Sequence, residues 1–192
     1  ATGNFNNLVT INAPGTTNIK GLEADFTVVP VDNLQVNLNY AYTTTDIPLV
    51  NITATAGGVS TSVLQKFYVV FTPKNAYSAS VDYNLPIGNN SVKFHLDGNH
   101  SDATQTFDQF ATTNDASTIF NTKVSWVAKK VTVGAWARNL LDAQYVYRRD
   151  PSNSLPGAPS SSVTTGSVSN ILGDYGNFNA PRTYGLEFTT KF

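Results

Sequence analysis

The residues best suited to metal or acid–base chemistry lie close together in one polar stretch of the chain. His95 and Asp97 are two positions apart, so in an extended strand their side chains point to the same side. Imidazole and carboxylate are both zinc ligands, but a zinc site needs three or four protein ligands, and no third one stands out nearby. We therefore expect these two residues to form hydrogen bonds, and we expect no cofactor.

Hydrolytic chemistry has little support in the sequence. The chain has no cysteine and only two histidines, both near one expected strand, so it has no thiol nucleophile and no Ser-His-Asp arrangement stands out. Gly57-Gly58 lacks the spacing of a phosphate-binding loop and is not followed by a helix pattern. The sequence therefore predicts that the chain is not an enzyme.

Two groups of residues are candidates for binding a solute. The first lies on the polar side of expected strands, where simple solvation or contact with another part of the protein is the alternative: Asp82, Lys93, His95, Asp97 and Arg138. The second lies near the two ends of the last long link between strands: Tyr147, Arg148, Arg149, Tyr175 and Phe178. Arginine suits carboxylate or phosphate groups, and aromatic rings suit catechol, haem or sugar faces. Because binding residues concentrate on loops held by a rigid scaffold, we expect ligand contacts in the second group.

The elements that must position these residues are strands, because apolar and polar residues alternate with a period of two over seven segments. In segment 33–46, for example, the even-numbered residues from Leu34 to Tyr42 are apolar or aromatic, and the odd-numbered ones are polar or small. The seven segments are 19–29, 33–46, 76–85, 91–99, 119–127, 131–139 and 182–192. The pattern predicts antiparallel strands with one apolar and one polar side.

The links between these segments alternate strictly between short and long. The short ones, 30–33, 86–90 and 128–130, are built from Pro, Gly, Asn and Asp or from a basic step. The long ones are 44–75, 101–117 and 148–181, and the apolar run 63–71 within the first is expected to extend two strands or to cap the sheet. In an up-and-down sheet all short turns then lie at one end, as in outer-membrane barrels.

Segment length separates a membrane barrel from a soluble sandwich. Sandwich strands usually have about 5 to 6 residues. Eleven residues rising about 3.3 Å each and tilted about 40° cover roughly 27 Å, close to an apolar band about 25 Å tall. Aromatic residues lie near both ends of the apolar side, as expected at two bilayer interfaces: Tyr40, Tyr42, Tyr77, Phe120 and Tyr184 at the long-loop end, and Phe26, Tyr83, Trp126 and Phe192 at the other. We therefore favour a barrel wall and keep a secreted β-sandwich binding module as the alternative.

Composition and strand count complete this interpretation. The formal net charge of −1 gives no basic surface for nucleic acid. The stub 5–11 is too short for a complete eighth strand, and single-chain bacterial barrels close with even strand numbers from 8 upward. The sequence thus predicts an all-β, antiparallel up-and-down transmembrane β-barrel that is incomplete, with about seven strands.

Four sequence motifs resemble the C-terminal part of the TonB-dependent outer-membrane receptor family. The most specific is 134–145, Gly-Ala-Trp-Ala-Arg-Asn-Leu-Leu-Asp-Ala-Gln-Tyr, and the chain ends on 180–192, which resembles the closing strand with its terminal Phe. Lys20-Gly21-Leu22-Glu23, and Thr72-Pro73-Lys74-Asn75 leading to Tyr83, resemble two further recurring steps. Their order and spacing make the resemblance specific.

This resemblance implies a 22-stranded barrel filled by an N-terminal plug domain. Such a receptor imports a scarce nutrient, for instance a ferric siderophore, haem, a vitamin or a glycan, through the bacterial outer membrane. No plug and no TonB-contacting segment is recognisable here, so residues 1–192 are expected to be the C-terminal part of the barrel domain. The partners implied are outer-membrane lipid, the other strands, the plug, the TonB energy-coupling complex and the small nutrient ligand. The barrel-assembly machinery is a further one, and the signal that it reads is expected in Tyr184, Leu186, Phe188 and Phe192. A passive porin-like channel remains the alternative function.

Overall fold

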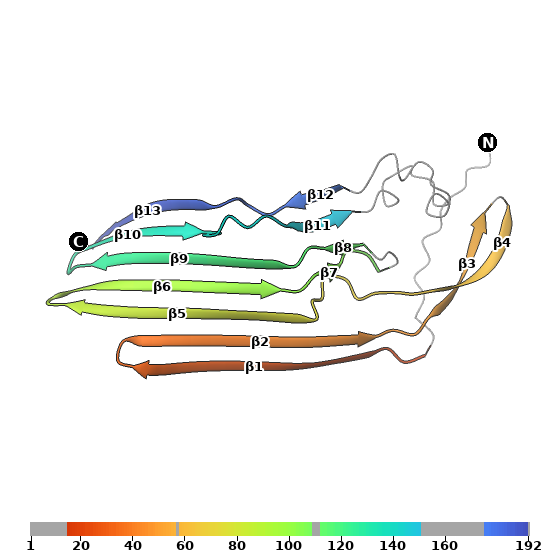
Figure 1. Cartoon of the computed structure of the whole chain (residues 1–192), viewed down its shortest axis with the longest axis horizontal. Coiled ribbons are helices and arrows are strands. Elements are labelled where there is room, and N and C mark those ends of the chain that lie inside the picture. Colours follow the sequence, from red (N-terminus) through yellow and green to blue (C-terminus); the bar gives the residue numbers. More distant parts are fainter. Residues whose placement is uncertain (1–14, 57, 109–111, 151–174, 192) are drawn as a thin grey trace.

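The computed structural model describes residues 15–56, 58–108, 112–150 and 175–191 (Figure 1). These residues form strands, turns and irregular links. They include no helix of the length and apolarity needed to cross a membrane. The expected stub 5–11 and the Ser/Thr-rich part of the last long link lie outside the described residues.

Seven long strands form one antiparallel sheet. Each strand pairs with the next one in the order β1-β2-β5-β6-β9-β10-β13. Their bounds are β1 (Asn18–Val31), β2 (Leu34–Asp46), β5 (Asn75–Ile87), β6 (Asn90–Ser101), β9 (Ser117–Val127), β10 (Val131–Arg138) and β13 (Thr183–Thr190). The structure confirms each of the seven predicted segments to within a few residues. The sheet is open, with β1 and β13 at its two edges, so the described residues do not close a barrel.

The short turns all lie at one end of the sheet, where Figure 1 also places the C-terminus. Asn33 and Gly88 adopt positive φ angles of 64° and 56° in the first two of these turns. Asparagine and glycine are the residues that adopt this conformation most easily, which explains their use here. The strict alternation of short and long links is therefore confirmed.

The long links carry three small two-stranded sheets at the opposite end (Figure 1). They are β3 (Val50–Ala56) with β4 (Val59–Gln65), β7 (Thr104–Gln105) with β8 (Thr113–Asn114), and β11 (Val146–Asp150) with β12 (Tyr175–Phe178). The apolar run 63–71 is only partly a strand, because β4 ends at Gln65. Beyond it, Val70 forms an isolated bridge with Gln105.

The apolar side of the large sheet is not covered by another layer. Among the described residues only Val50 and Val146 are buried hydrophobic residues, whereas Leu186 is 85% and Phe188 69% exposed. A β-sandwich would bury this side against a second sheet about 10 Å away. The described part of the chain therefore lacks the core of a soluble sandwich, and we call this side the apolar face.

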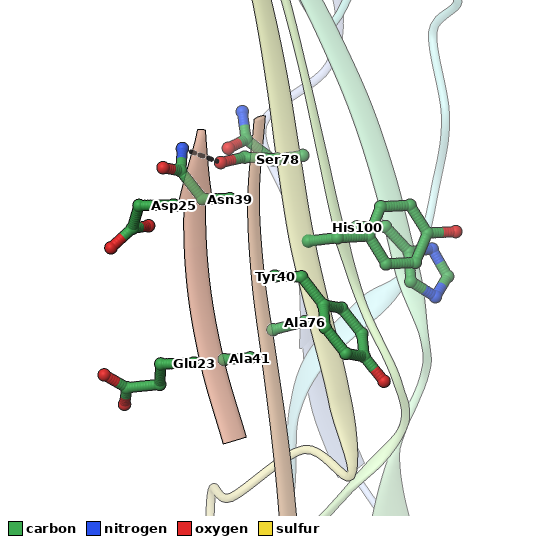
Figure 2. Close-up of a pocket in the computed structure, with 10 residues that line it drawn as sticks. Glu23, Asp25, Asn39, Tyr40, Ala41, Ala76, Ser78 and His100 are labelled. Carbon is green, nitrogen blue, oxygen red and sulfur yellow. Dashed lines mark hydrogen bonds between the residues drawn. The ribbon is translucent and has the colours of Figure 1, made fainter. Parts of the chain in front are cut away.

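The opposite side, which we call the polar face, is held together by side-chain hydrogen bonds between neighbouring strands. Asn37 Nδ2 donates to Ser80 Oγ at 3.1 Å, and Thr27 Oγ1 lies 3.0 Å from Asn37 Oδ1. One row further, Asn39 Nδ2 donates to Ser78 Oγ at 3.0 Å, the bond drawn in Figure 2. These bonds follow from the register, which places each pair directly opposite one another.

A buried asparagine ties the end of β10 to the start of β13. Asn139 is 6% exposed and has a φ of 50°. Its Nδ2 donates to the carbonyl oxygens of Ala143 and Ala180 at 2.9 and 3.1 Å, and its Oδ1 accepts from Ala143 N at 2.9 Å. Asp142 also has a positive φ, and its Oδ1 accepts from Arg182 N at 2.9 Å. The Asn-Leu-Leu-Asp step is thus a structural junction.

Candidate functional site

His95 lies between two carboxylates on the polar face. Its Nδ1 is 2.7 Å from Asp82 Oδ1, and its Nε2 is 3.3 Å from Asp97 Oδ1. The other oxygen of Asp97 accepts from Asn99 Nδ2 at 3.0 Å and from Asn121 Nδ2 at 2.8 Å. The hydrogen bonding predicted for His95 and Asp97 is confirmed. In the described part of the chain no three His, Cys, Asp or Glu residues are arranged to hold a metal ion.

An ion pair crosses from β9 to β13 beside this network. Lys123 Nζ lies 3.0 and 2.9 Å from the two carboxylate oxygens of Glu187. The pair passes over β10 at Gly134, which lies opposite Glu187. Because glycine has no side chain, the Lys123 side chain can cross β10 there and contact Glu187. Both side chains are 41% exposed, so the pair contributes at most about 1 kcal/mol to stability. Its clearer effect is to fix the positions of one cation and one anion.

Trp136 is a further residue of the polar face that, like Lys123 and Glu187, was not among the candidates from the sequence. Its register partners are Lys123 on β9 and Gly185 on β13, so the indole lies on the polar face. A Cβ atom at Gly185 would come within 2.6 Å of the indole, which shows that the ring packs against that glycine's backbone. The Arg138 guanidinium carbon lies 5.4 Å from the centroid of the ring, a cation–π distance. One signal in the sequence could have identified Trp136: it is two positions from Arg138, so both side chains lie on the same side of the strand.

These side chains surround a shallow hollow of about 230 Å³. It is lined by His95, Asp97, Asn121, Thr122, Lys123, Trp136, Ala137, Arg138 and Glu187. Of the predicted polar group, the hollow includes His95, Asp97 and Arg138. Asp82 reaches it only through its bond to His95, and Lys93 lines a different hollow near the turn between β1 and β2.

The apolar face carries an aromatic row at the long-loop end. Tyr77 and His100 stack with ring centroids 4.5 Å apart, and Tyr40 Oη donates to Asn75 Oδ1 at 2.9 Å. Figure 2 shows Tyr40 and His100 on the side opposite to Glu23. The residues around this region come from both faces of one sheet, so they do not enclose a cavity. Rings with a polar edge at one height are typical of a membrane interface.

Asp102 follows this row directly after β6. Its Oδ2 accepts from the side-chain and backbone nitrogens of Asn75 at 2.7 and 3.0 Å, and its Oδ1 lies 3.4 Å from His100 Nε2. The Asn75 amide, and to a lesser extent His100, hold the pKa of the Asp102 carboxyl below its usual value, against the opposing effect of desolvation. The Asp102 carboxylate thus links the end of β6 to the start of β5.

The predicted ligand residues of the last long link lie on β11 and β12, and Arg149 is bonded to another link. Arg149 Nη2 forms a salt bridge with Asp115 Oδ1 at 3.2 Å, and Arg149 N donates to Asn114 Oδ1 at 2.8 Å. Tyr147 and Phe178 are half to two-thirds exposed. Arg148 lies opposite Asn177 in the register, and Tyr175 opposite Asp150, with the side chain of Tyr175 outside the description. Ligand binding by this group stays a prediction.

The predicted assembly signal lies on the apolar face of β13. Tyr184 and Leu186 are the most exposed of its side chains, at 79% and 85%, and Phe188 follows the same parity. Phe192 lies outside the described residues. Their role in barrel assembly stays a prediction.

Comparison with known proteins decides the family. The family model for the TonB dependent receptor-like β-barrel matches residues 1–140. The chain belongs to this family. The match ends within the Asn-Leu-Leu-Asp junction, so the resemblance of 180–192 to a closing strand lies beyond it. No curated protein matches the sequence.

Two solved receptor structures share the fold of this TonB-dependent receptor barrel chain. The ferric yersiniabactin uptake receptor FyuA from Yersinia pestis has a TM-score of 0.65 at 13% identity, over 92% of this chain and 24% of its own. The siderophore receptor PiuA from Acinetobacter baumannii has a TM-score of 0.61 at 14% identity, over 92% of this chain and 22% of its own. The chain thus spans about a quarter of either receptor.

Proposed function

We propose that this chain forms part of the wall and the ligand-facing loops of an outer-membrane receptor that imports a scarce nutrient, such as a ferric siderophore. The uncovered apolar face carries this proposal. A sheet with exposed leucine and phenylalanine on one side and hydrogen-bonded polar residues on the other suits lipid outside and water or protein inside. Membership of the TonB-dependent family supports active import rather than passive flow through a porin-like channel.

The nature of the nutrient is supported by two observations. Both solved neighbours are named as siderophore or ferric-siderophore receptors. In this chain Arg148 and the exposed rings of Tyr147 and Phe178 lie at the long-loop end, where an anionic ligand with flat rings would first arrive. We propose this end as the ligand-capturing side, with no enzymatic step.

The proposal also names partners. Outer-membrane lipid would cover the apolar face, and the remaining strands and a plug domain would meet the sheet edges and the polar face. The TonB complex would supply energy through a part of the protein outside this chain, and the barrel-assembly machinery would recognise β13. Membership of the family supports a ligand and the TonB complex as partners in general, and the other partners are part of the same proposal.

Growth under iron limitation tests this function. The full-length receptor is expressed in a bacterial strain that lacks its own siderophore receptors, with a panel of purified ferric siderophores as the only iron source. We expect at least one siderophore to support growth, and we expect the growth to disappear in a matched strain without TonB. Uptake that persists without TonB would instead establish a passive channel, and growth on none of the siderophores would refute the substrate class.

A further inference from the structure

The hollow on the polar face contains a guanidinium that the described chain leaves without an acidic partner. Among the described residues Arg138 forms no salt bridge and no side-chain hydrogen bond, and its one ring contact is with Trp136. The neighbouring basic side chains differ, because Lys123 is paired with Glu187, and the ring nitrogens of His95 contact Asp82 and Asp97. Asp97 already accepts from Asn99 and Asn121 and lies 3.3 Å from His95 Nε2, and it is not bonded to Arg138.

The guanidinium is exposed, but it has one packing contact on the sheet. Trp136 packs against Gly185, where even a Cβ atom would come within 2.6 Å of the ring, so the indole has a fixed support on the sheet. Arg138 lies over this indole at 5.4 Å. A planar guanidinium stacked on an aromatic ring keeps its N–H edge available and loses little freedom when it binds.

We propose that Arg138, positioned by Trp136 and Gly185, is a carboxylate-binding subsite on the polar face. A guanidinium edge matches a carboxylate with two parallel charge-assisted hydrogen bonds. The carboxylate has two sources, a small organic acid passing along the wall or an Asp or Glu side chain from a part of the protein outside this chain. The first source rests on the proposed import function, and the second does not.

Fluorine NMR of Trp136 tests this subsite in the intact receptor. The full-length protein is labelled with 5-fluorotryptophan in detergent micelles, and the Trp136→Phe variant assigns the resonance. Benzoate is added at constant ionic strength, with chloride as the control anion. For a small-molecule carboxylate we expect a saturable shift of the Trp136 resonance with benzoate and none with chloride.

Variants with matched controls connect the shift to the proposed geometry. Arg138→Gln is expected to raise the half-saturating benzoate concentration about tenfold or more, because two charge-assisted hydrogen bonds are lost. Lys129→Gln removes one cation at a short turn and is expected to change nothing. Gly185→Ala is expected to weaken binding by displacing the indole. Gly98→Ala is its control. A Cβ atom at Gly98 would also come within 2.6 Å of a ring, that of Phe120, but on the apolar face, so this variant should leave binding unchanged.

The two sources give different results. If an internal carboxylate already occupies Arg138, benzoate has no effect. The Trp136 resonance then titrates below about pH 4, because the guanidinium lowers the pKa of its carboxyl partner, and this titration disappears in Arg138→Gln. If neither benzoate nor this pH range moves the resonance, the subsite is refuted. None of these NMR measurements requires transport. The Arg138 subsite can therefore be confirmed when the growth assay fails, and it can be refuted when the growth assay succeeds.

Discussion

Replacing Val81 with arginine tests whether the apolar face meets lipid. Val81 is the seventh of the thirteen residues of β5 and lies between Val36 and Leu96 on the neighbouring strands. Thirteen residues rising about 3.3 Å each at a tilt of about 40° span about 33 Å along the membrane normal, so Val81 lies about halfway. Arginine at the bilayer midplane costs about 2–4 kcal/mol, which is a roughly 30- to 1000-fold loss in the folding equilibrium constant.

Gln35→Arg is the matched control for this change. Gln35 lies opposite Asp82, one step along from the Val36–Val81 pair but on the polar face, and its side chain is exposed. A new cation there meets water and a carboxylate, so we expect a change below about 0.5 kcal/mol. Urea unfolding of the full-length receptor in lipid vesicles measures both variants. Equal costs at the two positions would refute the assignment of the faces, and a larger cost at Gln35 would invert it.

Three further perturbations follow from the contacts described above. Asn139→Ala removes three buried side-chain hydrogen bonds and is expected to destabilise the receptor by about 2–4 kcal/mol in urea unfolding, and because glycine tolerates the positive φ, Asn139→Gly should cost less. Because the folded-state pKa of Asp102 is lowered from its ordinary 3.8, its contribution is complete above that pH and is lost as the pH falls through the lowered value. Thermal unfolding of Asp102→Asn should therefore depend less on pH below about 4 than that of the wild type, and an unchanged acid dependence would contradict the Asn75 contact. Asp115→Ala removes the acceptor of Val146 N and the partner of Arg149, so hydrogen exchange at the Val146 amide should accelerate about tenfold or more while β5 and β6 amides stay unchanged.

The large sheet could be predicted from the sequence because alternation determines it directly. A period of two assigns each residue to a face, and the contrast between links such as 30–33 and 44–75 assigns each end. The small sheets of the long links were not predicted. Their pairing, such as Val146 with Phe178, depends on backbone contacts between distant segments, and alternation over four or five residues carries too little information to specify them.

The candidate site was only partly predictable for a related reason. Asp97 and Arg138 were found because charge on the polar side is conspicuous in the sequence. Trp136 was missed because a large apolar residue at a polar position contradicts the binary pattern, and its place depends on Gly185, a residue 49 positions later that has no side chain. The internal partner of Arg149 likewise lies in another link, at Asp115.

The long links are joined to one another as well as to their own strands. Tyr68 N donates to Asp108 O at 2.8 Å, Val70 bridges Gln105, and Asp115 N donates to Val146 O at 3.0 Å. These contacts join the three long links to one another, so a change in the length of one link affects the other two. An insertion or deletion in one of them would shift its neighbours, so grafting a single segment from another receptor should transfer less of the donor's properties than grafting the three as a set.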